Sequence, residues 1–339
     1  MHHDSLEFHN VAELAPAPGG GLHLARFPSS VWPKAEAPGG LTTIRTSNGC
    51  EIRFVLDKPR IRIWLRPAQG PANLVHLRGN QVVEYQTLPE GIIHCLEIDA
   101  PPLEPNRDPA VRKVGGFSPD VYRIYSQGGT LVYHGMDPMG GSPRPPAPEE
   151  KPSRRWLAYG SSITQSSGNM HGYVHDAQQL LEADACNLGM GGSCWVEPAI
   201  ADFIAERDDW DFASFELGVN MRNPARQNDG FRDKVRYLLD TVTAAHPKKP
   251  VFLITMFDCG EFHEITPSDM QRDQLEKDEI LREAAAEHPG QVTLIEGREV
   301  ITDFLGFKAD LLHPDAFAYA RMAIRLAEKM DPVLRERGL

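Results

Sequence analysis

The pattern of apolar residues changes at a proline-rich stretch near the middle of the chain, and this change constrains the fold more than any other feature. Residues 140–148 read Gly-Gly-Ser-Pro-Arg-Pro-Pro-Ala-Pro, and Glu-Glu-Lys-Pro follows at residues 149–152. Such sequences are typical of stiff segments between domains. Because the chain has 339 residues, each side is long enough to bury its own core. We therefore predict a domain over residues 1–140, a linker over residues 141–153 and a second domain over residues 154–339.

The first part of the chain has the pattern of short β-strands. Residues 60–66 alternate charged and apolar side chains, as expected for a strand with one face in water. Similar runs, separated by Gly, Pro and Asn, occur at residues 51–56, 81–85, 92–98, 121–125 and 130–134. Residues 99–109 are rich in proline and read as a long loop. This pattern predicts an all-β antiparallel sandwich or jelly roll.

The second part alternates apolar runs with helical patterns. The apolar runs read as buried strands at residues 156–159, 185–188, 212–217, 251–257 and 292–295. Helical spacing is clearest at residues 173–183, 231–245, 271–287 and in a last helix that we expect Pro314 to open. Alternation of this kind indicates an α/β domain with a mostly parallel sheet.

Charge and composition narrow the range of partners. A net charge of −12 argues against nucleic acid or an anionic membrane surface, because both would repel the protein. The N-terminal residues lack a signal-peptide pattern, and no segment approaches the roughly 20 apolar residues of a transmembrane helix. We therefore expect a cytoplasmic location.

The five cysteines lack CxxC spacing, so reduced thiols are expected rather than disulfides or a zinc site.

Four short segments of the second part carry side chains suited to acyl-transfer chemistry. They read Tyr-Gly-Ser-Ser-Ile-Thr-Gln, Asn-Leu-Gly-Met-Gly-Gly, Glu-Leu-Gly-Val-Asn and Asp-Leu-Leu-His-Pro, at residues 159–165, 187–192, 216–220 and 310–314. The first three follow predicted strands, and the fourth precedes the last helix. Because ligands of such sheets bind at the carboxyl ends of the strands, we expect all four segments to converge on one edge of the sheet.

Each segment has a candidate chemical role. Ser162 lies where a strand becomes a helix and is a candidate nucleophile. His313 is the candidate base, and Asp310, three residues earlier, is suited to hold the imidazole. The N–H groups of Ser162 and Gly192 and the side-chain amide of Asn220 are candidate donors to an oxyanion. Taken singly, each also has an ordinary interpretation as a helix cap, a turn or a solvated loop acid. Their combination in this order favours an active site.

These segments resemble the sequence blocks of the SGNH (GDSL-like) hydrolase superfamily, which is named for its Ser, Gly, Asn and His. The resemblance covers about residues 155–330 and implies a three-layer α/β/α domain of flavodoxin-like type. It implies Ser162 as the nucleophile, Asp310 and His313 as the acid–base pair, and Gly192 and Asn220 as oxyanion donors.

The chain departs from the family pattern at two positions. The first block of the family reads Gly-Asp-Ser, and this chain has Ser161 in place of the aspartate. Met221 follows Asn220, where an aspartate is usual. Neither position is one of the four residues that name the family, so the resemblance points to a divergent branch rather than to an inactive one.

Further residues near the four segments are candidates for a substrate pocket: Met190, Trp195, Met221, His171, Asp258 and His263. A metal site is conceivable around Asp258 and His263, but a loop that contacts substrate or is simply solvated is favoured. His171 and His175 are spaced as in a zinc-protease helix but lack its glutamate. We therefore predict no metal, and no organic cofactor is needed for the expected chemistry.

The sequence predicts a serine esterase that acts on an O-acylated, for example O-acetylated, sugar or small metabolite. Two alternatives stay open. One is an acyltransferase that moves an acyl group onto a hydroxyl of a small natural product, and the other is a non-catalytic glycan-binding protein. The domain order is similar both to two-domain carbohydrate esterases and to natural-product acyltransferases. The expected partner is a small-molecule or carbohydrate ester, with neither nucleic acid nor membrane, and homo-oligomer formation is left open.

Overall fold

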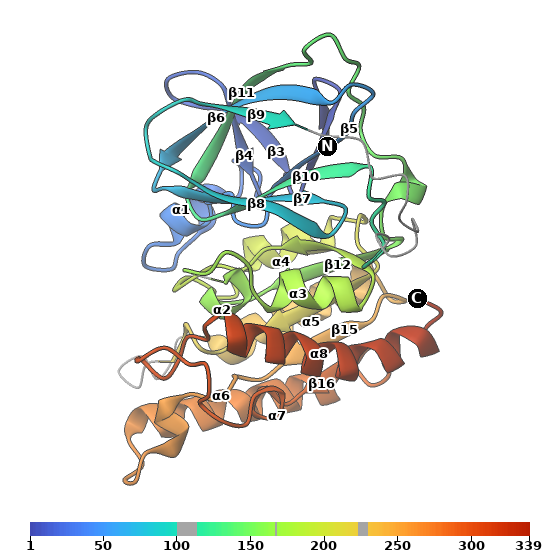
Figure 1. Cartoon of the computed structure of the whole chain (residues 1–339). Helices are drawn as coiled ribbons and strands as arrows, with labels where there is room; N and C mark the ends of the chain where they lie inside the picture. Colours follow the sequence, from blue (N-terminus) through green and yellow to red (C-terminus); the bar gives the residue numbers. More distant parts are fainter. Residues whose placement is uncertain (100–113, 167, 223–229) are drawn as a thin grey trace. The chain divides into compact units, whose positions relative to one another are not determined.

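The computed structural model of the chain describes residues 1–99, 114–166, 168–222 and 230–339 (Figure 1). Most of the loop predicted at residues 99–109 thus lies outside the described residues. The chain forms two compact units. The first comprises Met1–Trp32, Ile44–Ser153 and Glu182–Asn187, and the second comprises Pro33–Thr43, Arg154–Leu181 and Leu188–Leu339.

The first unit contains two antiparallel sheets. One has six strands in the order β1-β2-β5-β10-β7-β8, and the other has five in the order β3-β4-β11-β6-β9. The strands of the first sheet are β1 (His2–His3), β2 (Leu6–His9), β5 (Glu51–Val55), β7 (Ala72–Arg78), β8 (Gln81–Leu88) and β10 (Val121–Gln127). Those of the second are β3 (Glu13–Pro16), β4 (Leu22–Ala25), β6 (Arg60–Gln69), β9 (His94–Asp99) and β11 (Thr130–Asp137).

Apolar side chains from both sheets meet in one core. Ile52 of β5 and Ile124 of β10 belong to the same buried cluster as Ile63 of β6 and Leu131 of β11. Because successive residues of a strand point to opposite faces, each strand contributes alternate side chains to this layer. The prediction of an antiparallel β-sandwich is therefore confirmed. Strand β7 and the strands before residue 51 were not predicted.

Buried ion pairs occupy positions of the six-stranded sheet that alternate with the core residues. Glu51 accepts hydrogen bonds from the guanidinium groups of Arg53 (2.7 Å) and Arg123 (2.7 Å to each oxygen). All three side chains are at most 2% exposed. The Phe117 ring lies 3.9 Å from the guanidinium carbon of Arg123. Strands β5 and β10 are thus buried on both faces, so their charged side chains are not solvated.

A five-stranded sheet in the order β13-β12-β14-β15-β16 forms the centre of the α/β fold. Strands β12, β14, β15 and β16 pair in parallel. The strands are β12 (Arg154–Tyr159), β13 (Ala183–Asn187), β14 (Phe212–Glu216), β15 (Val251–Ile254) and β16 (Val292–Ile295). This is the 2-1-3-4-5 order of flavodoxin-like folds, whose ligand crevice lies where the strand order reverses, between β12 and β14 here. The predicted fold class is confirmed.

Helices cover the sheet in two groups (Figure 1). Helix α3 packs against α8, whereas α4 packs against α5 and α5 against α6. Their bounds are α3 (Tyr173–Leu180), α4 (Pro198–Ala205), α5 (Phe231–Ala245), α6 (Asp269–Ala286) and α8 (Ala316–Glu336). Shorter helices are η1 (Trp32–Lys34), α1 (Gly40–Thr43), η3 (Pro148–Glu150), α2 (Ser162–Gln165), η5 (Gly260–His263) and α7 (Gly297–Val300).

The start of the last helix differs from the prediction. Helix α8 begins at Ala316, and Asp315 is its N-cap, with a side chain that accepts the N–H groups of Phe317 (2.9 Å) and Ala318 (3.1 Å). Pro314 instead pairs with Phe307 in an isolated β-bridge. The expectation that Pro314 opens the helix is therefore wrong, because the side-chain cap lies one residue after the proline.

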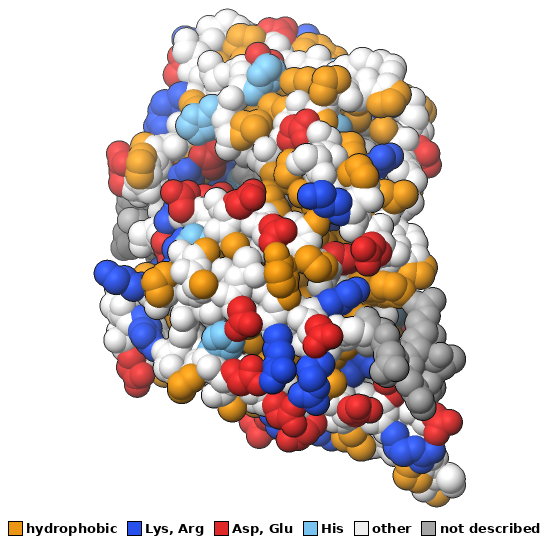
Figure 2. Space-filling view, turned by 180° about the vertical axis from the view of Figure 1, so that it is seen from behind, with side chains coloured by type: hydrophobic (Ala, Val, Ile, Leu, Met, Phe, Trp, Pro, Cys, Tyr) orange, Lys and Arg blue, Asp and Glu red, His pale blue; other side chains and the backbone are white. Residues whose placement is uncertain are grey.

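Surface charges of both signs are intermixed on the face shown in Figure 2. On helices α5 and α6, Arg232 pairs with Glu283 and Arg236 with Glu287. Exposed pairs of this kind contribute little to stability.

The five cysteines all lie among the described residues, and none forms a disulfide bond. In the same part of the chain, no helix has the length and apolarity needed to cross a bilayer.

Candidate active site

The turn between β12 and α2 carries the candidate nucleophile. Strand β12 ends at Tyr159, and Ser162 is the first residue of α2. Ser161 caps this helix, since its Oγ accepts the N–H of Ile163 at 3.1 Å. The Ser162 side chain is 8% exposed. Its hydroxyl is therefore held at the end of a strand, as the sequence predicted.

A buried glutamate from the neighbouring strand holds this turn. Glu216, the last residue of β14, is 1% exposed. Its Oε2 accepts the N–H of Ser161 (2.8 Å), the hydroxyl of Ser161 (2.7 Å) and the hydroxyl of Thr164 (2.9 Å). Burial raises the pKa of Glu216, and the bonds from Ser161 and Thr164 oppose that rise only in part.

The position before Ser161 accepts only glycine for a steric reason. A Cβ atom on Gly160 would lie 2.8 Å from Oε2 of Glu216 and would also clash with Oγ1 of Thr164. Both of these atoms belong to the hydrogen-bonded group that holds the turn. Gly160 is thus explained by the close approach of the Glu216 carboxylate to the backbone.

Ser162, His313 and Asp310 form a continuous hydrogen-bonded series. The Oγ of Ser162 lies 2.8 Å from Nε2 of His313, and Nδ1 of His313 lies 2.7 Å from Oδ2 of Asp310. Both lengths are normal for hydrogen bonds between such groups. The three residues that the sequence predicted as nucleophile, base and acid are therefore brought together in the order that the chemistry requires.

Asp310 is held by the backbone of its own loop. Its Oδ1 accepts the N–H groups of Leu312 and His313, both at 3.0 Å. Burial disfavours ionisation of this carboxyl, but the bonds from the His313 backbone, the His313 side chain and Leu312 outweigh burial and lower the pKa of Asp310 to about 2. The side chain is thus a carboxylate at neutral pH and can only accept from the imidazole.

The loop around His313 is closed by backbone bonds. Lys308 N–H donates to the carbonyl of His313 (2.9 Å), and Asp315 N–H donates to that of Gly306 (2.7 Å). Leu311 has a φ of +49°, a left-handed conformation that is rare for a branched residue. Such conformations persist only where the surrounding structure holds them, and they cluster at functional sites.

The glycine-rich turn after β13 (within residues 187–192) lies against the turn between β12 and α2 that carries Ser162. Met190 N–H donates to the carbonyl of Gly160 (2.7 Å), and Gly191 N–H donates to the side chain of Gln165. Gly192 has a φ of +68°, which only glycine adopts readily, and a Cβ there would meet no neighbour within 4 Å. The requirement for glycine at residue 192 is therefore conformational.

Asn220 is oriented by the same turn. Its Oδ1 accepts the N–H of Cys194 at 3.0 Å, and its carbonyl accepts the indole N–H of Trp195 at 3.2 Å. With Oδ1 used in this way, Nδ2 is the end of the amide that can donate elsewhere. Among the described residues, no backbone acceptor is bonded to the N–H of Ser162 or of Gly192. These groups are the donors that the sequence predicted for an oxyanion.

The other predicted pocket residues differ in accessibility. Met190 and Met221 are buried, at 0% and 4% exposure, whereas Trp195 is half-buried. Asp258 is 5% exposed and accepts from Nε2 of His263 at 2.8 Å. The His263 side chain is 56% exposed.

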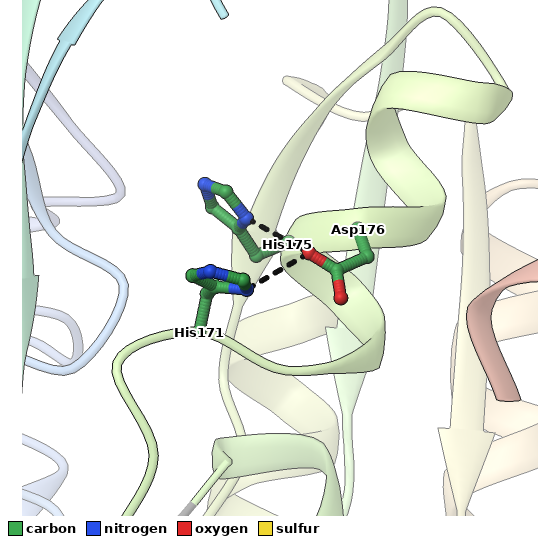
Figure 3. Close-up of side chains that lie close together, drawn as sticks. All are labelled: His171, His175 and Asp176. Atoms are coloured by element: carbon green, nitrogen blue, oxygen red, sulfur yellow. Dashed lines mark hydrogen bonds and ion pairs between the residues drawn. The ribbon is translucent and has the colours of Figure 1, made fainter. Parts of the chain in front are cut away.

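His171 lies in a different group of side chains, in the loop that leads into α3 (Figure 3). Nδ1 of His171 lies 2.9 Å from Oδ1 of Asp176, and Nδ1 of His175 lies 3.3 Å from the same oxygen. These ligand-type atoms lie within 4.8 Å of one another. Burial opposes ionisation of Asp176, but its bonds to the two imidazoles lower its pKa to about 2. One carboxylate thus orients two histidines, whereas Asp310 orients only His313.

Sequence reasoning missed the role of Glu216. The residue lies in the apolar run at 212–217 and is the only charged residue in it. Glutamate is almost never fully buried without a partner, so its place in a buried strand was the available signal. Its donors could not be identified from the sequence, because Ser161 is 55 positions away.

The fold is that of several solved enzymes. The chain is similar to the salicylyl-acyltransferase SsfX3 from a tetracycline biosynthetic pathway, with 17% identity, a TM-score of 0.79 and coverage of 97% of this chain and 95% of that one. It is similar to a family two carbohydrate esterase from Clostridium thermocellum, with 13% identity, a TM-score of 0.60 and coverage of 85% and 93%. An acetyl xylan esterase from the rumen bacterium Butyrivibrio proteoclasticus has 14% identity, a TM-score of 0.56 and coverage of 98% and 97%. At these identities the likeness shows the fold alone.

The sequence itself matches a family model. No curated protein sequence is similar enough to count as a match. The model of the GDSL-like Lipase/Acylhydrolase family, however, matches residues 153–335, which is more than half of the chain. That range contains the nucleophile turn, the glycine-rich turn, Asn220 and the loop of His313. The chain therefore belongs to the GDSL-like lipase/acylhydrolase family.

Proposed function

We propose that the protein is a serine esterase that acts on an O-acylated sugar or small metabolite through an acyl-enzyme. The observation that carries this proposal is the series from Oγ of Ser162 to Nε2 of His313 (2.8 Å) and from Nδ1 of His313 to Oδ2 of Asp310 (2.7 Å). A serine hydroxyl is a weak nucleophile unless a neighbouring base takes its proton, and this geometry supplies that base.

The first half of the reaction forms the acyl-enzyme. Oγ of Ser162 attacks the ester carbonyl carbon while its proton passes to Nε2 of His313, and Asp310 stabilises the resulting imidazolium. The N–H groups of Ser162 and Gly192 and the amide of Asn220 donate to the oxyanion. Loss of one such donor typically costs about 2.7–4 kcal/mol in the transition state. The tetrahedral intermediate then expels the alcohol, which takes the proton from His313.

The second half transfers the acyl group. Water gives its proton to His313 and attacks the acyl carbon, which releases the acid and regenerates Ser162. A hydroxyl of a small-molecule acceptor in place of water would make the protein an acyltransferase. The overlap with the salicylyl-acyltransferase SsfX3, at a TM-score of 0.79, supports this second candidate. The esterase is favoured because the matching family is one of lipases and acylhydrolases.

Hydrolysis of p-nitrophenyl acetate by the full chain tests the shared mechanism. Ser162→Ala should lower kcat by about 10³-fold or more, because the nucleophile is lost. Ser214→Ala is the matched control, since it removes a buried serine that accepts from the Trp156 indole (2.9 Å) and has no part in the proposed chemistry. Equal rates for the native protein and Ser162→Ala would contradict the proposal.

The acceptor is tested in the same assay. Candidate acceptor alcohols, such as monosaccharides and phenols, are added to the p-nitrophenyl acetate reaction, and the products are separated by mass. Release of acetate alone supports the esterase. Acetylated acceptor in excess of acetate would favour the acyltransferase, whereas a chain that turns over no ester would favour the glycan-binding alternative.

A further inference from the structure

We propose that Glu216 is a positioning residue for the nucleophile and acts as the hydrogen-bond acceptor that holds the turn carrying Ser162. This inference rests on the proposed function, because it assigns to Glu216 a role in the reactivity of Ser162. Glu216 does not touch the reacting atoms. It acts through Ser161 and Thr164, which flank Ser162 on either side.

A single carboxylate oxygen joins the strand to both ends of the turn. Oε2 of Glu216 accepts the N–H and the hydroxyl of Ser161 and the hydroxyl of Thr164, at 2.7–2.9 Å. The Thr164 hydroxyl also lies 2.7 Å from the hydroxyl of Tyr173 on α3. The backbone on each side of Ser162 is thus tied to the sheet, and Tyr173 extends the network to the next helix.

The partners of Glu216 distinguish it from a carboxylate that stabilises the fold through an ion pair. The groups that donate to its carboxylate belong to Ser161 and Thr164 and are uncharged, and its Oε1 has no hydrogen-bond partner among the described residues. Its neighbours in the sequence, Phe215 and Leu217, are 0% exposed, so an apolar residue would be the ordinary choice here. Burial of a carboxyl costs free energy unless the group is hydrogen-bonded. The hydrogen bonds that offset this cost for Glu216 go to the turn that carries Ser162.

The position of Ser162 is sensitive to this support. Its Oγ must remain 2.8 Å from Nε2 of His313, a residue 151 positions away. Without Glu216, the donors on Ser161 and Thr164 lose their acceptor, and we expect the turn to relax toward other acceptors. A misplacement of about 1 Å from a change outside the reacting groups can lower the rate about 10²-fold.

Ser161 and Glu216 form a matched pair. Oγ of Ser161 lies 2.7 Å from Oε2 of Glu216, so an aspartate at residue 161 would place two carboxylates in contact. Like charges at such a distance repel strongly in a buried site. This explains the serine where the family block Gly-Asp-Ser has an aspartate: the carboxyl comes from β14 instead.

Two measurements on the full chain test the inference: the rate at which phenylmethylsulfonyl fluoride sulfonylates Ser162, and kcat and KM for p-nitrophenyl acetate. Glu216→Ala should slow sulfonylation and lower kcat by about 10²-fold, with little change in KM. Glu216→Gln should stay within about tenfold of native, since its amide oxygen can accept the same donors while its NH2 takes the place of Oε1. Ser214→Ala, on the same strand, should lower the unfolding free energy without slowing either reaction.

A second experiment changes Ser161, the partner of Glu216. It also tests the inference if Glu216→Ala does not fold. Ser161→Asp should slow sulfonylation about 10²-fold, and the double variant Ser161→Asp with Glu216→Gln should recover at least tenfold, because an amide N–H can donate to the new carboxylate. Native sulfonylation in folded Glu216→Ala, or no recovery in the double variant, overturns the inference. Loss of activity in Ser162→Ala together with native rates in Glu216→Ala would leave the proposed function intact and reject only the role of Glu216.

Discussion

Two glutamates of this protein are equally buried and have opposite surroundings. Glu51, at the start of β5, and Glu216, at the end of β14, are each 1% exposed. Glu51 accepts from the guanidinium groups of Arg53 and Arg123. Among the residues that the structure describes, Glu216 accepts from hydroxyl and backbone N–H groups and not from a cation. One carboxylate is thus neutralised by cations in a β-sandwich, and the other holds a turn of the candidate active site.

The pKa values of the two carboxyls move in opposite directions for this reason. Burial raises the pKa of both groups. For Glu51 the charges of Arg123 and Arg53 outweigh burial, so its pKa lies well below the usual value. For Glu216 the uncharged donors do not outweigh burial, so its pKa is raised. Burial alone therefore does not tell a structural carboxylate from one at a functional site, whereas the charge of its partners does.

The largest effect on stability is expected at the ion-paired glutamate. Glu51→Ala leaves Arg53 and Arg123 buried with fewer partners, and loss of one member of a buried pair costs about 3–5 kcal/mol. Urea unfolding would measure this loss. The matched control is Glu97→Ala, which removes an exposed partner of Arg62 (3.0 Å) and should cost less than about 1 kcal/mol. Equal costs for the two variants would show that burial does not separate these pairs.

A third buried carboxyl, Asp278 on α6, extends the comparison. It is 0% exposed, and burial raises its pKa to about 6 against the opposing effects of the Met256 N–H and Arg298. Because the folded-state pKa exceeds the unfolded value of 3.8, the contribution of Asp278 to stability is fully present below about pH 4 and is lost as the pH rises to about 6, by roughly 3 kcal/mol. Asp278→Asn should abolish this fall and be more stable than native at pH 8. A native unfolding free energy that rises between pH 4 and 6, with no difference in Asp278→Asn, would contradict the assignment.

The smallest effect is expected from the charge of Glu216 itself. Its raised pKa means that the folded state binds the proton more tightly, so its contribution to stability is present below the usual value of 4.5 and is lost as the pH rises through the folded-state pKa. The donors on Ser161 and Thr164 oppose this effect of burial only in part. Unfolding of Glu216→Gln as a function of pH, compared with native, isolates this term. A difference in unfolding free energy, native minus Glu216→Gln, that grows as the pH rises would contradict this sign.

The candidate catalytic set was more accessible to sequence reasoning than the residues that support it. Ser162, Asp310 and His313 stand in segments whose order and spacing resemble a family, and the structure places them within hydrogen-bonding distance of one another. Their catalytic role stays a prediction until Ser162→Ala is measured. No sequence pattern indicated the roles of Glu216 and Thr164. Their hydrogen-bond partners depend on how β14 packs against α2.

Some features of the fold were not predicted, because local sequence patterns do not reveal them. Helix α4 (Pro198–Ala205) is short and almost uniformly apolar, so its sequence cannot be told from that of a buried strand. Arg53 and Arg123 alternate with apolar residues as solvated side chains would, yet both are buried. A pattern of alternation shows which side chains share a face, but not whether that face meets water.

The sequence by itself determined the two fold classes, the order of the strands and helices that carry the four segments, and the residue types available for acyl transfer. These follow from local periodicity and from the rule that parallel strands present their carboxyl ends at one edge. The tertiary structure alone decided which carboxylates are paired with arginines, which one holds the nucleophile turn and how close Ser162 lies to His313. Those outcomes depend on distances of about 3 Å between residues far apart in the chain, and such distances exist only once the core has packed.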